Sequence, residues 1–163
     1  MPEDGEVFNN RILTLVEELT EESWQVPYSR RVDSISNFQH TYAEEDDMIV
    51  ESLFEFSSDL SEEDIQAKQA VALKDPVLAG NLIAYDGKAT GVNITINLPG
   101  INQAKEVPEV VGFVREMVAK YEEAYPEVGF YLTGVTMTNN AFPEARAQDI
   151  KELYPVMILL ILV

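Results

Sequence analysis

Hydrophobic positions near the start of the chain repeat with the period of an α-helix. They fall at i, i+4, i+7, i+8 and i+11, on one helical stripe: Phe8, Ile12, Leu15, Val16 and Leu19. This spacing places the side chains on one face, so it predicts an amphipathic helix. Asp4 or Asn9 can cap its start, because both side chains accept hydrogen bonds from backbone N–H groups, and the stretch from Trp24 to Pro27 ends it.

A second helix is predicted by the residues at its two ends. Ser61 can cap the start, because its hydroxyl accepts a hydrogen bond from a free backbone N–H. Residues 62–64 are all acidic and fill the first turn, where the helix dipole favours negative charge. The helix is expected to run to Lys74 and to stop at Asp75-Pro76, since proline cannot continue it.

The third predicted helix has the longest pattern. Apolar residues repeat at steps of three and four: Val107, Val110, Val111, Val114, Met117, Val118 and Tyr121. Pro108 is compatible with a helix because it lies in the first turn. Pro126 is expected to end the helix.

Three further segments carry strand-like residues. Arg31–Asn37 and Met48–Phe54 show weak alternation, and Val128–Val135 follows the third helix. Between the first two lies Glu44–Asp47, a run of like charge that is expected to face water.

A hairpin is predicted around Asp86-Gly87-Lys88. Its arms would be Leu82–Tyr85 and Val92–Leu98, and Asp-Gly favours a tight turn with Gly87 at positive φ. In the second arm apolar residues alternate with polar ones: Val92, Ile94, Ile96 and Leu98 against Asn93, Thr95 and Asn97. This alternation indicates a strand with one buried face and one wet face.

The order of these elements predicts an α+β fold. Two βαβ units that pack their helices on one face of a mostly antiparallel sheet give a ferredoxin-like sandwich.

The chain finishes with eight consecutive apolar residues, Val156–Val163. A helix needs about 20 such residues to span a bilayer. The run is therefore either a buried final element or the first turns of a membrane helix. The preceding segment, Pro143–Tyr154, is polar and compatible with a helix that rises into an apolar medium.

Charge narrows the range of partners. The chain has 29 acidic and 11 basic residues, a formal net charge of −18, and most of the excess lies before residue 76. Such a surface repels phosphate backbones, so nucleic acid is not expected as a partner. The excess of acidic residues is consistent with high solubility or with a protein adapted to salt. The alternative is that these residues line a vestibule that attracts cations.

Candidate chemistry is sparse. The chain has no cysteine, which excludes a Cys-based zinc site, and His40 is its only histidine, so a catalytic triad or a His-based metal site has little to build on. No phosphate-binding glycine motif is present, and the acidic runs lack the spacing of a calcium loop. Tyr121, Tyr125, Phe130 and Tyr131 are interpreted as core packing. We therefore predict no catalytic, cofactor-binding or metal-binding residue, and no enzyme.

Several local strings resemble the RND superfamily, in particular its hydrophobe/amphiphile exporter branch with the MmpL-like proteins. Val32–Phe38 is similar to that family's V-x-S-L-T-N stretch, and Leu73–Ile83 to the segment that follows. Asp86-Gly87-Lys88-Ala89-Thr90 matches the D-G-K-A-T hairpin. Leu132–Val135, followed by Asp149 and the apolar run, resembles the family's entry into the second membrane helix.

The resemblance implies an extracytoplasmic loop between the first two membrane helices. Residues 1–144 would form a porter-type domain of the PN1/PN2 kind, and residues 145–163 the truncated start of the second membrane helix. The family's loop begins with a strand. Here only Pro2–Gly5 precede the first helix, so that strand is expected to be missing.

The resemblance also implies that this segment catalyses no reaction. Family members use the proton gradient to export lipids, drugs or other amphiphiles at the cell membrane, and their proton-carrying groups lie in membrane helices outside this sequence. The expected partners are the rest of the transporter, an amphiphilic substrate, and further copies bound through the apolar C-terminal tail. Two alternatives stay open: a free-standing ferredoxin-like ligand-binding module, and a hydrolase with a carboxylate site.

Overall fold

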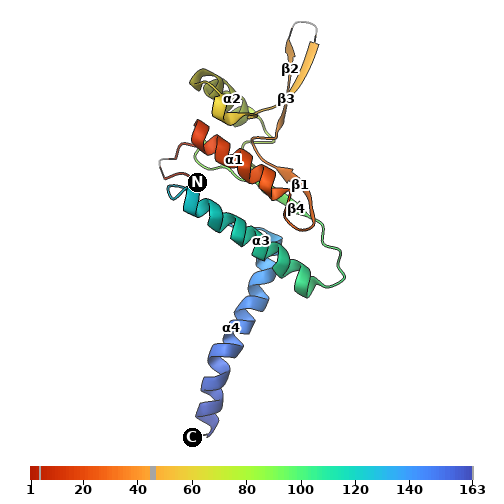
Figure 1. The fold of residues 1–163 in the computed structure, drawn as a ribbon, viewed down its shortest axis with the longest axis vertical. Coiled ribbons are helices and arrows are strands. Elements are labelled where there is room, and N and C mark those ends of the chain that lie inside the picture. Colours follow the sequence, from red (N-terminus) through yellow and green to blue (C-terminus); the bar gives the residue numbers. More distant parts are fainter. Residues whose placement is uncertain (4, 45–46, 163) are drawn as a thin grey trace.

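A computed structural model describes residues 1–3, 5–44 and 47–162 and has an α+β fold, as predicted. Its elements in chain order are α1 (Asn10–Ser23), β1 (Ser29–Asp33), β2 (Gln39–Glu44), β3 (Asp47–Ser52), the short 3-10 helix η1 (Ser57–Asp59), α2 (Glu62–Lys74), β4 (Asn93–Ile96), α3 (Gln103–Ala124) and α4 (Val135–Leu162). Figure 1 shows α1 in the middle of the body, with α2 and the β2–β3 hairpin towards one end and α3 and α4 towards the other.

The predicted helices are confirmed, and the caps explain where two of them begin. At α1 the side-chain oxygen of Asn9 accepts a hydrogen bond from the Ile12 amide at 2.9 Å. The alternative cap, Asp4, lies outside the described residues. At α2 the Ser61 hydroxyl accepts from the Asp64 amide at 3.2 Å, and the helix ends at Lys74 as expected.

The strands form two separate antiparallel pairs, β1 with β4 and β2 with β3. The predicted pairing of Val92–Leu98 with Leu82–Tyr85 is therefore wrong beyond one isolated bridge, Ile83 to Thr90. Instead β4 pairs with β1, where Val32 lies opposite Ile94 and joins two apolar side chains across the strands. The tight turn itself is confirmed, with Gly87 at φ +70°.

The predicted strand at 128–135 is also wrong. Only Val128 forms a bridge, and after Gly134, at φ +112°, the chain enters α4. No neighbouring strand in the described residues pairs with the segment, and Tyr131 is 82% exposed. Strand-forming residues build a sheet only beside another strand, so this segment stays irregular.

The described residues before α1 form no strand, but some of them pair with the segment that follows α3. Pro2 and Val128 form an antiparallel bridge. The Glu3 amide donates to the Glu127 carbonyl at 3.0 Å, and the Gly129 amide donates to the Met1 carbonyl at 2.8 Å. The described start of the chain is thus paired with the segment that follows α3.

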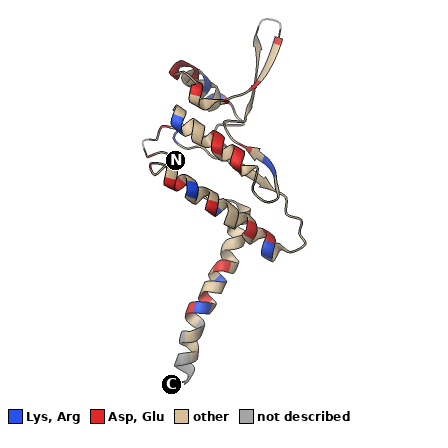
Figure 2. Cartoon of the chain, in the orientation of Figure 1, with Lys and Arg blue, Asp and Glu red and all other residues tan. Residues whose placement is uncertain are grey.

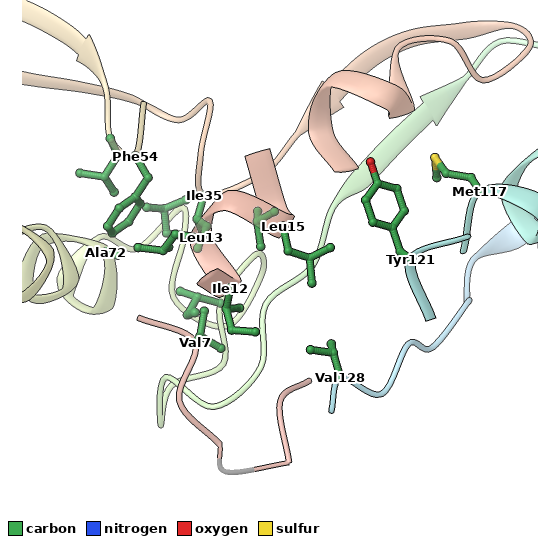
Figure 3. Packing of buried hydrophobic residues seen from close by; sticks show 14 of the residues in the cluster. Val7, Ile12, Leu13, Leu15, Ile35, Phe54, Ala72, Met117, Tyr121 and Val128 are labelled. Carbon is green, nitrogen blue, oxygen red and sulfur yellow. The ribbon is translucent and has the colours of Figure 1, made fainter. Parts of the chain in front are cut away.

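The hydrophobic core is built around the apolar stripe of α1 (Figure 3). Leu13 is fully buried near Phe54, and the ring of Phe54 lies 5.8 Å from that of Phe8. Towards α3, the core continues through Leu15 to Tyr121. One cluster therefore joins α1, α2 and α3 into a single body.

Helix α4 leaves this body and projects away from it (Figure 1). The sequence predicted a helix from about Ala145, and the structure begins it ten residues earlier, at Val135. The helix has 28 residues and contains Pro143 and Pro155. Within the described residues, no helix is both long enough and apolar enough to cross a membrane.

Candidate functional site

The chain's one histidine, His40, lies on the β2–β3 hairpin. His40 lies half-buried on β2, with its ring stacked on that of Tyr42 and the ring centres 5.5 Å apart. Among the described residues, no group of three or more His, Asp or Glu side chains could hold a metal ion. The search for a site therefore turns to the motifs and to exposed surfaces.

The first family-like motif builds a buried cluster of hydroxyl groups at the end of β1. The Thr20 hydroxyl on α1 donates to the Ser34 hydroxyl at 2.8 Å, and Ser34 and Ser36 share a hydrogen bond of the same length. Asn37 closes the turn, since its side chain accepts from the Ser34 amide and donates to the Val32 carbonyl. The cluster fixes β1 onto α1, and the hydroxyl groups satisfy one another.

The second and third family-like motifs also serve the fold. The Asp75 carboxylate accepts from the Val77 amide at 2.7 Å and so starts the turn after α2. Leu78 and Ile83 from the same segment are buried in the core. Gly87 packs its backbone close to Phe8. Residues of both motifs therefore contribute to turns and to the core of the fold.

One buried carboxylate organises the start of α3, and the sequence analysis missed it. Glu106 accepts hydrogen bonds from three consecutive amides: Gly100 at 3.1 Å, Ile101 at 3.0 Å and Asn102 at 2.8 Å. The Asn102 side chain makes no capping bond of its own. A capping box places its acid three residues after the cap, whereas Glu106 follows Asn102 by four, so that rule does not detect it.

A polar network ties α1 to α3. The Glu22 carboxylate accepts from Lys120 at 2.6 Å and from the Tyr121 hydroxyl at 2.9 Å. The hydrogen bond from Lys120 lowers the pKa of Glu22, and burial raises the pKa of Tyr121. Both groups therefore keep their charge states near neutral pH, with Glu22 ionised and Tyr121 protonated.

A shallow hollow lies beside this network, at the start of α1 and the end of α3. Its lining is Asn10, Arg11, Thr14, Ser58, Ala124 and Tyr125. The Arg11 guanidinium donates to Glu127 at 2.6 Å and lies 5.0 Å from the centre of the Tyr125 ring. Of the aromatic cluster predicted to be core, Tyr121 is buried, but Tyr131 is exposed.

The junction of α3 and α4 is held by a two-pronged ion pair. Arg115 donates to the two carboxylate oxygens of Glu144 at 2.6 and 3.0 Å. These hydrogen bonds hold the pKa of the Glu144 carboxyl below its ordinary value. Asn140, one turn earlier on α4, is buried at the same junction. Because a forked pair constrains orientation as well as distance, it sets the direction in which α4 leaves the body.

Both before and after this junction, α4 exposes apolar side chains. They include Val135, Phe142, Ile150, Leu153, Met157 and Ile158. Figure 2 shows acidic residues on α1, α2 and α3, whereas residues 153–163 of the sequence include no Asp, Glu, Lys or Arg. Monomeric water-soluble proteins rarely leave so much apolar surface uncovered, so α4 is the part of the structure best suited to contact another apolar surface.

The sequence model of the MMPL family matches residues 12–163, from the first turn of α1 through α4. No curated protein and no solved structure matches the chain. The chain therefore belongs to the MMPL family, whose members are membrane transporters of the RND type.

Proposed function

We propose that this chain is the extracytoplasmic porter-type domain of a proton-driven RND-type transporter that exports lipids, drugs or other amphiphiles. In this proposal residues 1–144 form a non-catalytic domain with the ferredoxin-like architecture of the family, and residues 145–163 begin the second membrane helix. The observation that carries the proposal is the family match, which includes both the body and the apolar end of α4.

The distribution of charge supports a body that stays off the bilayer while α4 enters it. The formal net charge of −18 repels anionic lipid headgroups. Many of the acidic residues lie on α1, α2 and α3 of the body. The last eight residues of the chain carry no charge. Under this arrangement α4 is the element that meets hydrocarbon, and the body lies in the extracytoplasmic space.

The domain would act through its surfaces. Polar side chains of its motifs form hydrogen bonds inside the fold, as Ser34 does with Thr20 of α1. We therefore assign the domain to the substrate pathway and to subunit contacts of the transporter, while proton transfer takes place in membrane helices outside this sequence.

Vesicle flotation tests the role of α4. The full chain should float with vesicles of neutral lipid, and the variant Met157→Asp/Ile158→Asp should stay in the dense fraction, because moving ionised carboxylates from water into an apolar medium is costly. The matched control is Val77→Asp/Tyr85→Asp, which changes two exposed apolar residues of the body. Equal flotation of all three proteins would refute the membrane role of α4.

Transport itself is tested with the complete reading frame that contains this segment. Cells that express it should accumulate less of a fluorescent amphiphile than empty cells, and a protonophore should abolish the difference. Deleting the codons for residues 12–134 should also abolish it. Unchanged accumulation in the presence of a correctly inserted protein would argue against export.

A further inference from the structure

Strand β4 carries a sequence pattern that the proposed transport function does not use. Asn93, Ile94 and Thr95 form an N-x-[ST] triplet, which is the acceptor pattern for N-linked glycosylation. Asn93 is the only asparagine of the chain that has a serine or threonine two positions later. The triplet therefore marks a single candidate modification site, and the structure shows whether an enzyme can reach it.

The two residues that define the triplet lie at the surface. Asn93 and Thr95 are both exposed, and they share one face of β4, because side chains two positions apart in a strand point to the same side. Ile94, between them, packs against the hydrophobic core. The space just before the triplet is also open, since a β-carbon built on Gly91 would have no atom within 4 Å. A group attached to Asn93 would therefore stand on the outer side of the β1–β4 pair, which lies beside α1 in Figure 1.

The neighbours across the strand pair do not occupy the polar groups of the triplet. Asp33 lies opposite Asn93, and Arg31 lies opposite Thr95. These two charged side chains bond to each other, with 2.7 Å between the Arg31 Nε and an Asp33 carboxylate oxygen. The side chains of Asn93 and Thr95 form no hydrogen bond with the residues that the structure describes. Both the acceptor amide and the hydroxyl are thus available at the surface.

The contacts of Asn93 also set it apart from asparagines that serve the fold. Asn9 caps α1, Asn10 donates to carbonyl groups of η1, and Asn37 closes the turn after β1. Asparagine is depleted in strands, and no hydrogen bond to the described residues compensates for its place in β4. Modification accounts for an asparagine at this position better than the fold does.

We propose that Asn93 is the attachment site of an N-linked glycan. The donor is a glycan carried on a lipid phosphate or diphosphate, and a transferase of the cell joins it to the protein. The side-chain nitrogen of Asn93 attacks C1 of the first sugar, and the C1–N bond forms as the bond from C1 to the phosphate oxygen breaks. The lipid phosphate leaves, and one amide proton passes to a base of the transferase. This inference rests on the proposed function, because it requires the body to lie on the extracytoplasmic side, where the transferase acts.

Mass spectrometry of the complete protein, purified from the cells that naturally make it, tests the proposal. Trypsin cleaves after lysine and so releases residues 89–105 as one peptide. This peptide also contains Asn97 and Asn102, which lack the triplet and serve as internal controls. Fragmentation that leaves the glycan attached should locate it on Asn93 alone. An unmodified peptide, or a glycan on another residue with Asn93 free, would overturn the proposal.

Three variants made in the same cells test whether the triplet is what the transferase recognises. Asn93→Gln and Thr95→Val should abolish the glycan, whereas Thr95→Ser should retain it, because a hydroxyl remains at position 95. All three changes lie at exposed positions, so thermal unfolding should show that the variants still fold. A glycan that persists in Thr95→Val would contradict the assignment.

An added triplet separates failure of this inference from failure of the proposed function. Ala104→Thr creates a second acceptor triplet from Asn102 to position 104, at the exposed start of α3 and within the same tryptic peptide. If Asn102 of this variant carries a glycan and Asn93 does not, the body faces the transferase and only the proposal for Asn93 is overturned. If neither residue carries one, although other surface proteins of the same cells do, the extracytoplasmic placement of the body fails as well.

Discussion

At the scale of single residues, two glycines in one loop test how the turn after α2 is built. Gly87 has a positive φ of +70°, and a β-carbon there would lie 3.4 Å from the Phe8 ring. Gly91, four residues later, has no positive φ and no atom within 4 Å of a built β-carbon. The two positions therefore differ in backbone strain and in space, although both lie in the same loop.

We expect Gly87→Val to destabilise the domain by roughly 1–3 kcal/mol, because valine rarely adopts positive φ and its side chain would meet Phe8. Chemical denaturation measures this as a lower midpoint with an unchanged slope. Gly91→Val should leave the midpoint nearly unchanged. An equal loss of stability in both variants would show that a general change in loop flexibility, and not the positive φ at Gly87, causes the destabilisation.

At the scale of elements, the Arg115–Glu144 pair is expected to hold the direction of α4. Arg115→Glu should broaden the distribution of distances between spin labels on α3 and α4, because two carboxylates would then face each other. Labels can be attached at Glu122→Cys and Lys151→Cys, since the chain has no cysteine. The double exchange Arg115→Glu/Glu144→Arg should restore the narrow distribution, whereas a purely steric defect would remain.

The distances between the spin labels on α3 and α4 should depend on pH, because the pKa of Glu144 is lowered. The pKa of Glu144 is lowered from 4.5 by the hydrogen bonds from Arg115, so its carboxylate stays ionised at pH 4.5 and above. The pair should therefore persist throughout that range and be lost only as the pH falls through the lowered pKa. Loosening of α4 already at pH 6 would contradict this assignment.

Sequence patterns predicted the elements that depend on neighbouring residues. Ser61 and Asp75-Pro76 marked α2 to the residue, and the apolar steps located α1 and α3. Pairings between distant segments were not predictable, because alternation in β4 shows that a strand has a buried face without showing which strand lies beside it.

The candidate site shows the same limit. The apolar end of α4 was visible in the sequence, but the Arg115–Glu144 pair joins residues 29 positions apart and follows no periodic pattern. The β2–β3 hairpin was half predicted, since Met48–Phe54 was read as strand-like while Gln39–Glu44 was not. Its polar residues His40 and Thr41 match no alternating template, and they form a strand because β3 lies opposite them.

At the scale of the whole molecule, the net charge of −18 predicts a stability that depends on salt. Self-repulsion between the acidic side chains of α1, α2 and α3 opposes the compact state, and ions screen it. The melting temperature should therefore rise as ionic strength increases from about 0.01 M to about 0.5 M, over which the screening length shortens from roughly 30 Å to a few ångströms.

An uncharged osmolyte at the same osmolality provides the control for this experiment, since it does not screen charge. A melting temperature that rises equally with salt and with the osmolyte would assign the effect to solvent exclusion rather than to charge.

The prolines of α4 have a consequence for how the body and the apolar end of this helix move. Pro155 lies directly before the apolar run that begins at Val156, and proline has no N–H to donate to the carbonyl one turn earlier. The helix is therefore less stiff against bending at the border between its polar and apolar parts than a helix without proline would be. A force on the apolar end would change the angle between the two parts of the helix at this point. Small movements of the apolar end would therefore not tilt the body. Rotation about the helix axis would still reach the body, because the backbone is continuous.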